Sequence, residues 1–193
     1  MSAVPQGLIA EFLHVIYNLS MKKMIVISGK QYCGKDTLAK LLLEELKDFR
    51  RIGIGDAIKL HYANENNLTF DDIEKNKHLY RADLIKLGNW GRAQDPDYWL
   101  KSIIELDENV IVPDVRVEHE IELFKKHGAF AVRVEASFEN RSKRATITNA
   151  DDETETALDN YNAWDAIVDN NSDYENLKNQ ANELISILRK NYL

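Results

Sequence analysis

Hydrophobic positions along the chain fall into short continuous runs, which alternate with longer stretches where apolar residues recur every three or four positions. The run MIVIS at residues 24–28 is apolar throughout, which is typical of a parallel strand buried on both faces. In residues 35–49, leucines at helical spacing lie opposite lysines and glutamates. This pattern predicts a strand, a short loop bounded by glycines, and a helix.

The rest of the chain repeats this alternation. Short apolar or alternating runs predict further strands at residues 51–54, 109–113, 129–135 and 166–168. Helical spacing predicts helices at residues 56–66, 118–127 and 174–189, and a mostly helical region at 71–106. Strands that alternate with helices imply an α/β fold in three layers around a parallel sheet, and ligands then bind beyond the carboxyl ends of the strands.

Three segments define the expected organisation of the chain. Residues from about 56 to 106 form an inserted helical lobe, and the polar residues from about 138 to 158 form a small lid. Residues 1–20 carry an apolar stripe with no basic segment before it and no run long enough to cross a bilayer, so they do not resemble an export signal. We treat them as an N-terminal extension, with Met21 as an alternative natural start, and expect residues 21–193 to form a single domain.

Composition limits the classes of protein that remain. The 193 residues, 44% of them apolar and 30% charged, suffice for one compact domain with a full core. The formal net charge of −7 argues against a general nucleic-acid binder, so local cations must bind any anionic ligand. A single cysteine, Cys33, excludes an internal disulfide and a cysteine-rich metal site. We therefore expect a cytoplasmic protein, monomeric or weakly dimeric, with neither nucleic-acid nor membrane partners.

The loop after the first predicted strand carries the pattern G-x-x-x-x-G-K, from Gly29 to Lys35. Between a strand and a helix, the two glycines let backbone N–H groups turn onto a phosphate, and the lysine reaches the β and γ oxygens. The pattern therefore predicts a phosphate-binding loop (P-loop) for ATP. The expected ATP-binding residues are Gly29, Lys30, Gly34, Lys35, Asp36 and Thr37.

Two carboxylates are candidates for ordering Mg²⁺, the expected cofactor of the bound ATP. Asp36 stands where serine or threonine commonly follows the lysine, with Thr37 one residue later. It either holds Mg²⁺ through a water molecule or serves as a helix N-terminal residue favoured by the dipole. Asp114 follows an apolar strand and Pro113, where it either orders the metal and its waters or is a turn residue.

Arginines are the other candidate phosphate ligands, although any one of them taken singly is more often a solvated surface residue. Arg116 is expected at the same edge of the sheet as the P-loop, while Arg81 and Arg92 lie in the helical lobe. Arg141 and Arg144 share one helical face at the start of the lid, where a closing pair of guanidinium groups stabilises charge on a transferring phosphoryl group.

The aromatic residues, the cysteine and the histidines are interpreted as structural residues, without a role in catalysis or metal binding. Trp90 and Trp99 are interpreted as core residues rather than base-stacking platforms, and Tyr32 and Cys33 as loop fillers. The histidines lack the clustering of metal ligands, so neither a catalytic histidine nor a zinc site is indicated.

Four segments, in their order along the chain, resemble P-loop kinases of the group that includes animal-type phosphomevalonate kinase and phage-type deoxynucleoside monophosphate kinase. These segments are SGKQYCGKDT (28–37), YRADLIKLGNWGRAQDPDYW (80–99), PDVRVEHEIELF (113–124) and DDETETALDN (151–160). The resemblance implies a nucleoside monophosphate kinase-like fold, with ATP on Lys35 and Asp36. The acceptor-binding residues that it implies are Arg81, Arg92 and Arg116. The expected catalytic residues are Lys35, Arg116, Arg141 and Arg144.

The favoured function is transfer of the γ-phosphoryl group of ATP to a small phosphate monoester, preferably a (deoxy)nucleoside monophosphate. Phosphomevalonate kinase is the alternative, weakened because Gln31 and Val117 stand where animal phosphomevalonate kinases have arginine. A non-catalytic nucleotide-binding regulator is the alternative from another class. A GTPase is disfavoured because Asn76-Lys77 does not continue into an N-K-x-D motif.

Overall fold

A five-stranded parallel sheet forms the centre of the computed structural model, which describes residues 22–147 and 150–193. The strands lie in the order β2-β3-β1-β4-β5, and every neighbouring pair is parallel. Their bounds are β1 Met24–Ser28, β2 Phe49–Arg51, β3 Asn109–Val115, β4 Phe130–Glu135 and β5 Ala166–Asp169. The predicted α/β fold with a parallel sheet is thereby confirmed.

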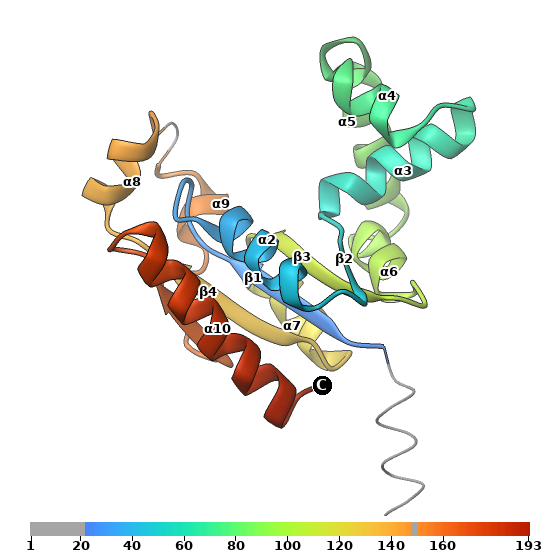
Figure 1. The fold of residues 1–193 in the computed structure, drawn as a ribbon. Coiled ribbons are helices and arrows are strands. Elements are labelled where there is room, and N and C mark those ends of the chain that lie inside the picture. Colours follow the sequence, from blue (N-terminus) through green and yellow to red (C-terminus); the bar gives the residue numbers. More distant parts are fainter. Residues whose placement is uncertain (1–21, 148–149) are drawn as a thin grey trace, which may run out of the picture.

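Helices cover both faces of the sheet and give it three layers (Figure 1). Helices α2 (Lys35–Glu45) and α10 (Tyr174–Asn191) pack on one face, and α7 (Glu118–Lys126) lies on the other. Because β1 is buried on both faces, its alternate residues serve two separate cores: Ile25 packs with the leucines of α2 and α10, and Val26 with Phe124 of α7. The continuous apolar run thus reflects a central strand.

The helical lobe and the lid stand apart from each other beyond the carboxyl edge of the sheet (Figure 1). The lobe consists of α3 (Ile54–Asn66), α4 (Phe70–Lys75), α5 (Lys77–Gln94) and α6 (Tyr98–Ile104). The segment predicted as a lid, called the lid below, carries α8 (Phe138–Arg144) and α9 (Glu153–Thr156). Trp99 anchors the lobe, since its indole N–H donates to the carbonyl of Gly88 at 3.0 Å and its ring lies where a Cβ at Gly91 would come within 2.6 Å.

Several predicted boundaries shift. The first predicted helix ends at Glu45 instead of residue 49, and β2 ends three residues before the predicted strand does. The reason is local: the Asp56 carboxylate accepts the N–H of Gly53 at 2.9 Å, which starts α3 at Ile54 and removes that residue from the strand.

One core prediction is wrong. Trp99 is buried at 2% exposure, but Trp90 is 47% exposed. The expected extension, residues 1–20, lies outside the described residues. Among the helices that the structure describes, none combines the length and the apolarity needed to cross a membrane.

Candidate nucleotide and acceptor sites

The P-loop joins β1 to α2 in the tight path that its glycines permit. Gly34 is left-handed, with φ of 104°, and a Cβ there would come within 2.2 Å of the side-chain nitrogen of Asn170. A Cβ at Gly29 would meet the Cys33 sulfur at 2.4 Å. Cys33 is buried, and burial raises the pKa of its thiol, so this cysteine is a packing residue, as predicted. Tyr32 lies in the left-handed region, with φ of 60°.

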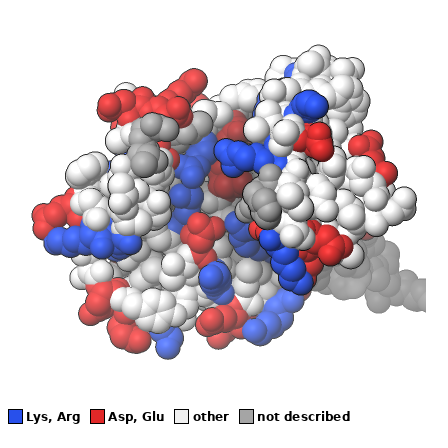
Figure 2. Space-filling view, turned by 90° about the horizontal axis from the view of Figure 1, so that it is seen from above, with Lys and Arg blue, Asp and Glu red and all other residues white. Residues whose placement is uncertain are grey.

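A cavity of about 460 Å³ opens above the P-loop. It is lined by Gln31, Tyr32, Gly34, Lys35, Asp36, Thr37, Arg116 and Arg144, so most of the predicted ATP and catalytic residues meet there. Lys35 is 7% exposed, and burial lowers the pKa of its ammonium group because the charged form loses solvent. Viewed from above, several lysine and arginine side chains lie around the hollow in the middle of the molecule, with acidic side chains between them (Figure 2). The lysines and arginines supply the local cations that an anionic ligand requires.

Arg116 reaches this cavity from the segment after β3, and there it meets a carboxylate that sequence reasoning did not single out. Its guanidinium nitrogen lies 2.6 Å from one oxygen of Glu155, a residue of α9. The other oxygen of Glu155 accepts the backbone N–H of Gln31, within the P-loop, at 2.7 Å. The Glu155 side chain is 3% exposed. An acidic group of the lid is therefore buried against the phosphate-binding loop.

The two lid arginines both donate hydrogen bonds to carbonyl groups of the P-loop. Arg144 donates to the carbonyl of Tyr32 at 3.0 Å and to that of Asn170 at 2.7 Å. Arg141, buried at 6% exposure, donates to the carbonyl of Gln31 at 3.2 Å. Arg144 lines the cavity above the loop, whereas Arg141 lines a different cavity, described below.

The two candidate metal residues differ in exposure and in the groups that they contact. Asp36 is 64% exposed and pairs with Arg51 at 3.3 Å. Asp114 is held by the N–H groups at the start of α3, with Ile54 at 3.0 Å, and burial raises the pKa of its carboxyl group. Within residues 22–147 and 150–193, no cluster of three or more His, Cys, Asp or Glu residues is arranged to hold a metal. Asp36 and Asp114 fit a Mg²⁺ ion that is held mainly by phosphates and waters, with one or two carboxylates nearby.

A separate cavity of about 310 Å³ lies in the helical lobe and contains the expected acceptor arginines. Its lining consists of Gly55, Lys59, Arg81, Leu84, Ile85, Gly88, Asn89 and Arg92. Arg81 and Arg92 therefore share one pocket, whereas Arg116 belongs to the cavity above the P-loop. Lys59 is already paired with the carboxylates of Asp56 and Glu74.

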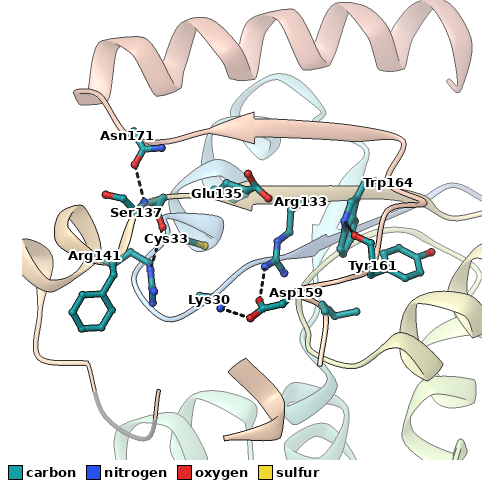
Figure 3. Close-up of a pocket in the computed structure, with 14 residues that line it drawn as sticks. Lys30, Cys33, Arg133, Glu135, Ser137, Arg141, Asp159, Tyr161, Trp164 and Asn171 are labelled. Atoms are coloured by element: carbon teal, nitrogen blue, oxygen red, sulfur yellow. Dashed lines mark hydrogen bonds and ion pairs between the residues drawn. The ribbon is translucent and has the colours of Figure 1, made fainter. Parts of the chain in front are cut away.

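A third cavity, of about 530 Å³, borders the other side of the P-loop and extends along the end of β4 (Figure 3). Lys30, an expected ATP-binding residue, points into it and pairs with Asp159 at 2.7 Å. The buried Arg133 lies 3.9 Å from the same carboxylate and over the ring of Trp164. Asp159 thus neutralises a loop residue and a strand residue together, which the sequence alone did not indicate.

Comparison with known proteins agrees with this arrangement. The family model for phosphomevalonate kinase matches residues 27–130, and the model for deoxynucleotide monophosphate kinase matches residues 83–181. Each match covers more than half of the chain. The chain belongs to this group of P-loop kinases. It is accordingly a phosphotransferase that acts on a small substrate with a phosphate group as acceptor, and the resemblance noted in the sequence is confirmed.

The individual relatives share low sequence identity with this chain. A phosphomevalonate kinase of Drosophila melanogaster is 29% identical over 154 residues, which span 72% of this chain and 82% of that protein. Among solved structures, shikimate kinase from Acinetobacter baumannii in complex with shikimate has a TM-score of 0.55 at 13% identity, covering 92% of this chain and 98% of that one. An APS kinase from Mycobacterium tuberculosis in complex with AMPPNP and APS has a TM-score of 0.52 at 16% identity, covering 87% and 98%. These structures support the P-loop kinase fold.

Proposed function

We propose that this chain transfers the γ-phosphoryl group of ATP to a nucleoside or deoxynucleoside monophosphate. The observation that carries the proposal is the composition of the lobe cavity. Its two arginines, Arg81 and Arg92, match one phosphate. Leu84, Ile85 and the amide of Asn89 offer an apolar and hydrogen-bonding surface of the kind that a neutral, planar base requires. The match to the deoxynucleotide monophosphate kinase model, which includes most of α5, agrees with this.

In the proposed reaction, an oxygen of the acceptor phosphate attacks the γ-phosphorus, and the bond to the β-phosphate breaks to release ADP. The acceptor phosphate is already ionised near neutral pH, so no strong general base is needed. Lys35 binds the β and γ oxygens, and its burial strengthens this attraction. Arg116 and Arg144, which line the same cavity, stabilise the charge of the transferring group, and Arg141 positions the loop.

Mg²⁺ bound to the ATP phosphates would neutralise part of their charge and orient them. Asp36 and Asp114 are the residues that would order the ion or its waters. Both lie near Arg51, which pairs with Asp36 and whose charge also acts on Asp114.

Phosphomevalonate is the second candidate acceptor, and a specific observation favours it. The Drosophila melanogaster relative is a phosphomevalonate kinase, and the corresponding family model matches residues 27–130. Phosphomevalonate carries a carboxylate as well as a phosphate, so it needs cations at both ends. Gln31 and Val117 remove two such cations in comparison with animal phosphomevalonate kinases, and for this reason we place it second.

The test is ADP release from ATP and Mg²⁺ with a panel of acceptors: ribonucleoside and deoxynucleoside monophosphates, phosphomevalonate and dephospho-coenzyme A. We expect turnover with one or a few monophosphates and none with the Lys35→Ala variant, which excludes contaminating kinases. Selective turnover of phosphomevalonate would replace the first candidate by the second.

The acceptor pocket has its own test. Arg81→Ala should raise the KM of the acceptor about tenfold or more and leave the KM of ATP unchanged, because the arginine lies in the lobe cavity. Lys86→Ala is the matched control, since Lys86 is an exposed cation of the same helix and does not line this cavity. Equal effects of the two variants would contradict the assignment of the pocket.

A further inference from the structure

Glu155 occupies a position in which a phosphate group is expected. Its two oxygens accept from the Gln31 N–H at 2.7 Å and from the Arg116 guanidinium at 2.6 Å. Loop N–H groups and an arginine are the donors that P-loops direct at phosphate oxygens. The charge of the carboxylate also acts on Lys35, the residue expected to reach the β and γ oxygens. Glu155 therefore lies among three groups that a nucleotide would require.

Burial makes this contact costly to break. The side chain is 3% exposed, so an ionised Glu155 depends on Gln31 and Arg116 for the interactions that water would otherwise supply. Conversely, a donor that is committed to Glu155 is not available to a phosphate, because one N–H makes one strong hydrogen bond. Nucleotide and carboxylate exclude each other at these donors.

A second carboxylate fastens the same segment to the loop. Asp159, four residues after Glu155, pairs with Lys30 at 2.7 Å and lies 3.9 Å from Arg133 (Figure 3). Lys30 and Gln31 are neighbours in the P-loop, so the segment from Glu155 to Asp159 crosses the loop and is attached at two consecutive positions. These two attachments together hold the Glu155 carboxylate against the loop.

We infer that Glu155 is a built-in competitor for the β and γ phosphates of ATP, and that α9 must leave the P-loop before the nucleotide can bind fully. The inference rests on the proposed role of the loop in binding ATP. Binding would release Arg116 from Glu155 at the moment when the phosphates need it. The lid then responds to the nucleotide through one exchange of anions, carboxylate for phosphate.

The test compares Glu155→Gln with Glu153→Gln by calorimetric titration with pyrophosphate and with ATP. Both changes remove one negative charge from α9, but Glu153 is exposed. We expect Glu155→Gln to lower the Kd of both ligands about tenfold, equivalent to about 1.4 kcal/mol, since the amide leaves Arg116 free for phosphate. Glu153→Gln should bind as the wild type does. Unchanged or weaker binding by Glu155→Gln, or an equal gain in the control, overturns the inference.

A measurement on the unaltered chain provides an independent check. Pyrophosphate has no base or ribose, so it tests displacement of α9 alone. Amide hydrogen exchange of residues 153–159 should become faster when pyrophosphate binds, because the segment loses its attachments. Unchanged or slower exchange refutes the displacement. Binding of the Lys35→Ala variant separates the two ideas: if Lys35 is required for pyrophosphate binding while Glu155→Gln has no effect, the ATP site stands and the competitor does not.

Discussion

Replacement of Gly34 by alanine tests whether the backbone geometry of the P-loop depends on glycine. The φ angle of 104° lies in a region that costs an L-residue about 1–2 kcal/mol. The new Cβ would also come within 2.2 Å of the Asn170 side-chain nitrogen, which donates to the Cys33 carbonyl at 2.7 Å. Displacing that buried amide removes a hydrogen bond worth about 1 kcal/mol. Gly34→Ala should therefore lower the free energy of unfolding by about 2–3 kcal/mol.

The two contributions can be separated with Asn170→Ala. Alone, this variant loses the hydrogen bond to the Cys33 carbonyl, about 1 kcal/mol, and it also clears the space beside residue 34. The double variant then retains only the backbone strain and the hydrogen bond already lost. Its destabilisation should match that of Gly34→Ala alone, so that the two single effects fail to add by about 1 kcal/mol.

Urea unfolding with a common m-value gives the required free energies. Gly55→Ala is the stability control, because no heavy atom lies within 4 Å of a Cβ built at Gly55 and its φ is negative. The reasoning is refuted if Gly34→Ala and Gly55→Ala are equally stable, or if the effects of Gly34→Ala and Asn170→Ala are additive. ATP affinity should fall in Gly34→Ala, since the N–H groups that follow residue 34 lose their direction.

Three further variants probe the lid, the sheet edge and the C-terminal helix. Arg144→Ala should reduce kcat about 10²-fold or more and weaken ATP binding less, with the exposed neighbour Lys143→Ala near wild type in steady-state assays. Asp114→Asn should raise the thermal unfolding midpoint at neutral pH and lower kcat. Burial raises the pKa of Asp114, so the wild-type carboxyl group loses its contribution to stability as pH rises through that pKa. Thermal scans should therefore show that the gain in the variant vanishes in acid. Tyr192→Phe should cost about 1–2 kcal/mol in urea unfolding, because the hydroxyl lies 2.8 Å from the Met24 carbonyl and 2.9 Å from that of Gly128.

The fold could be predicted to the extent that burial leaves a mark in the sequence. The run MIVIS marks a central strand, because β1 is covered on both faces. The strand β2 is short and mostly exposed, with burial only at Phe49, so no apolar pattern fixed its bounds. Trp90 was misassigned because helical spacing shows which residues share a face, but not whether a neighbouring element covers it.

The site was predictable where one short segment provides the chemistry. Lys35 follows from G-x-x-x-x-G-K, since the loop and the helix start act together. Glu155 is different: it lies in the acidic segment DDETETALDN, which reads as a solvated polar stretch, and its contact with Gln31 spans more than a hundred residues of chain. No local pattern shows that this glutamate is buried while Glu153, two residues earlier, is exposed.

The core between α2 and α10 sets the order in which the protein is completed during synthesis. The P-loop and α2 leave the ribosome early, but their apolar side is covered by leucines of α10, at the other end of the chain. Asn170 and Arg144, which fasten the loop, are also made late. At typical elongation rates the interval is on the order of ten seconds. The nucleotide site is therefore completed only after α10 has docked, well after its P-loop has been synthesised.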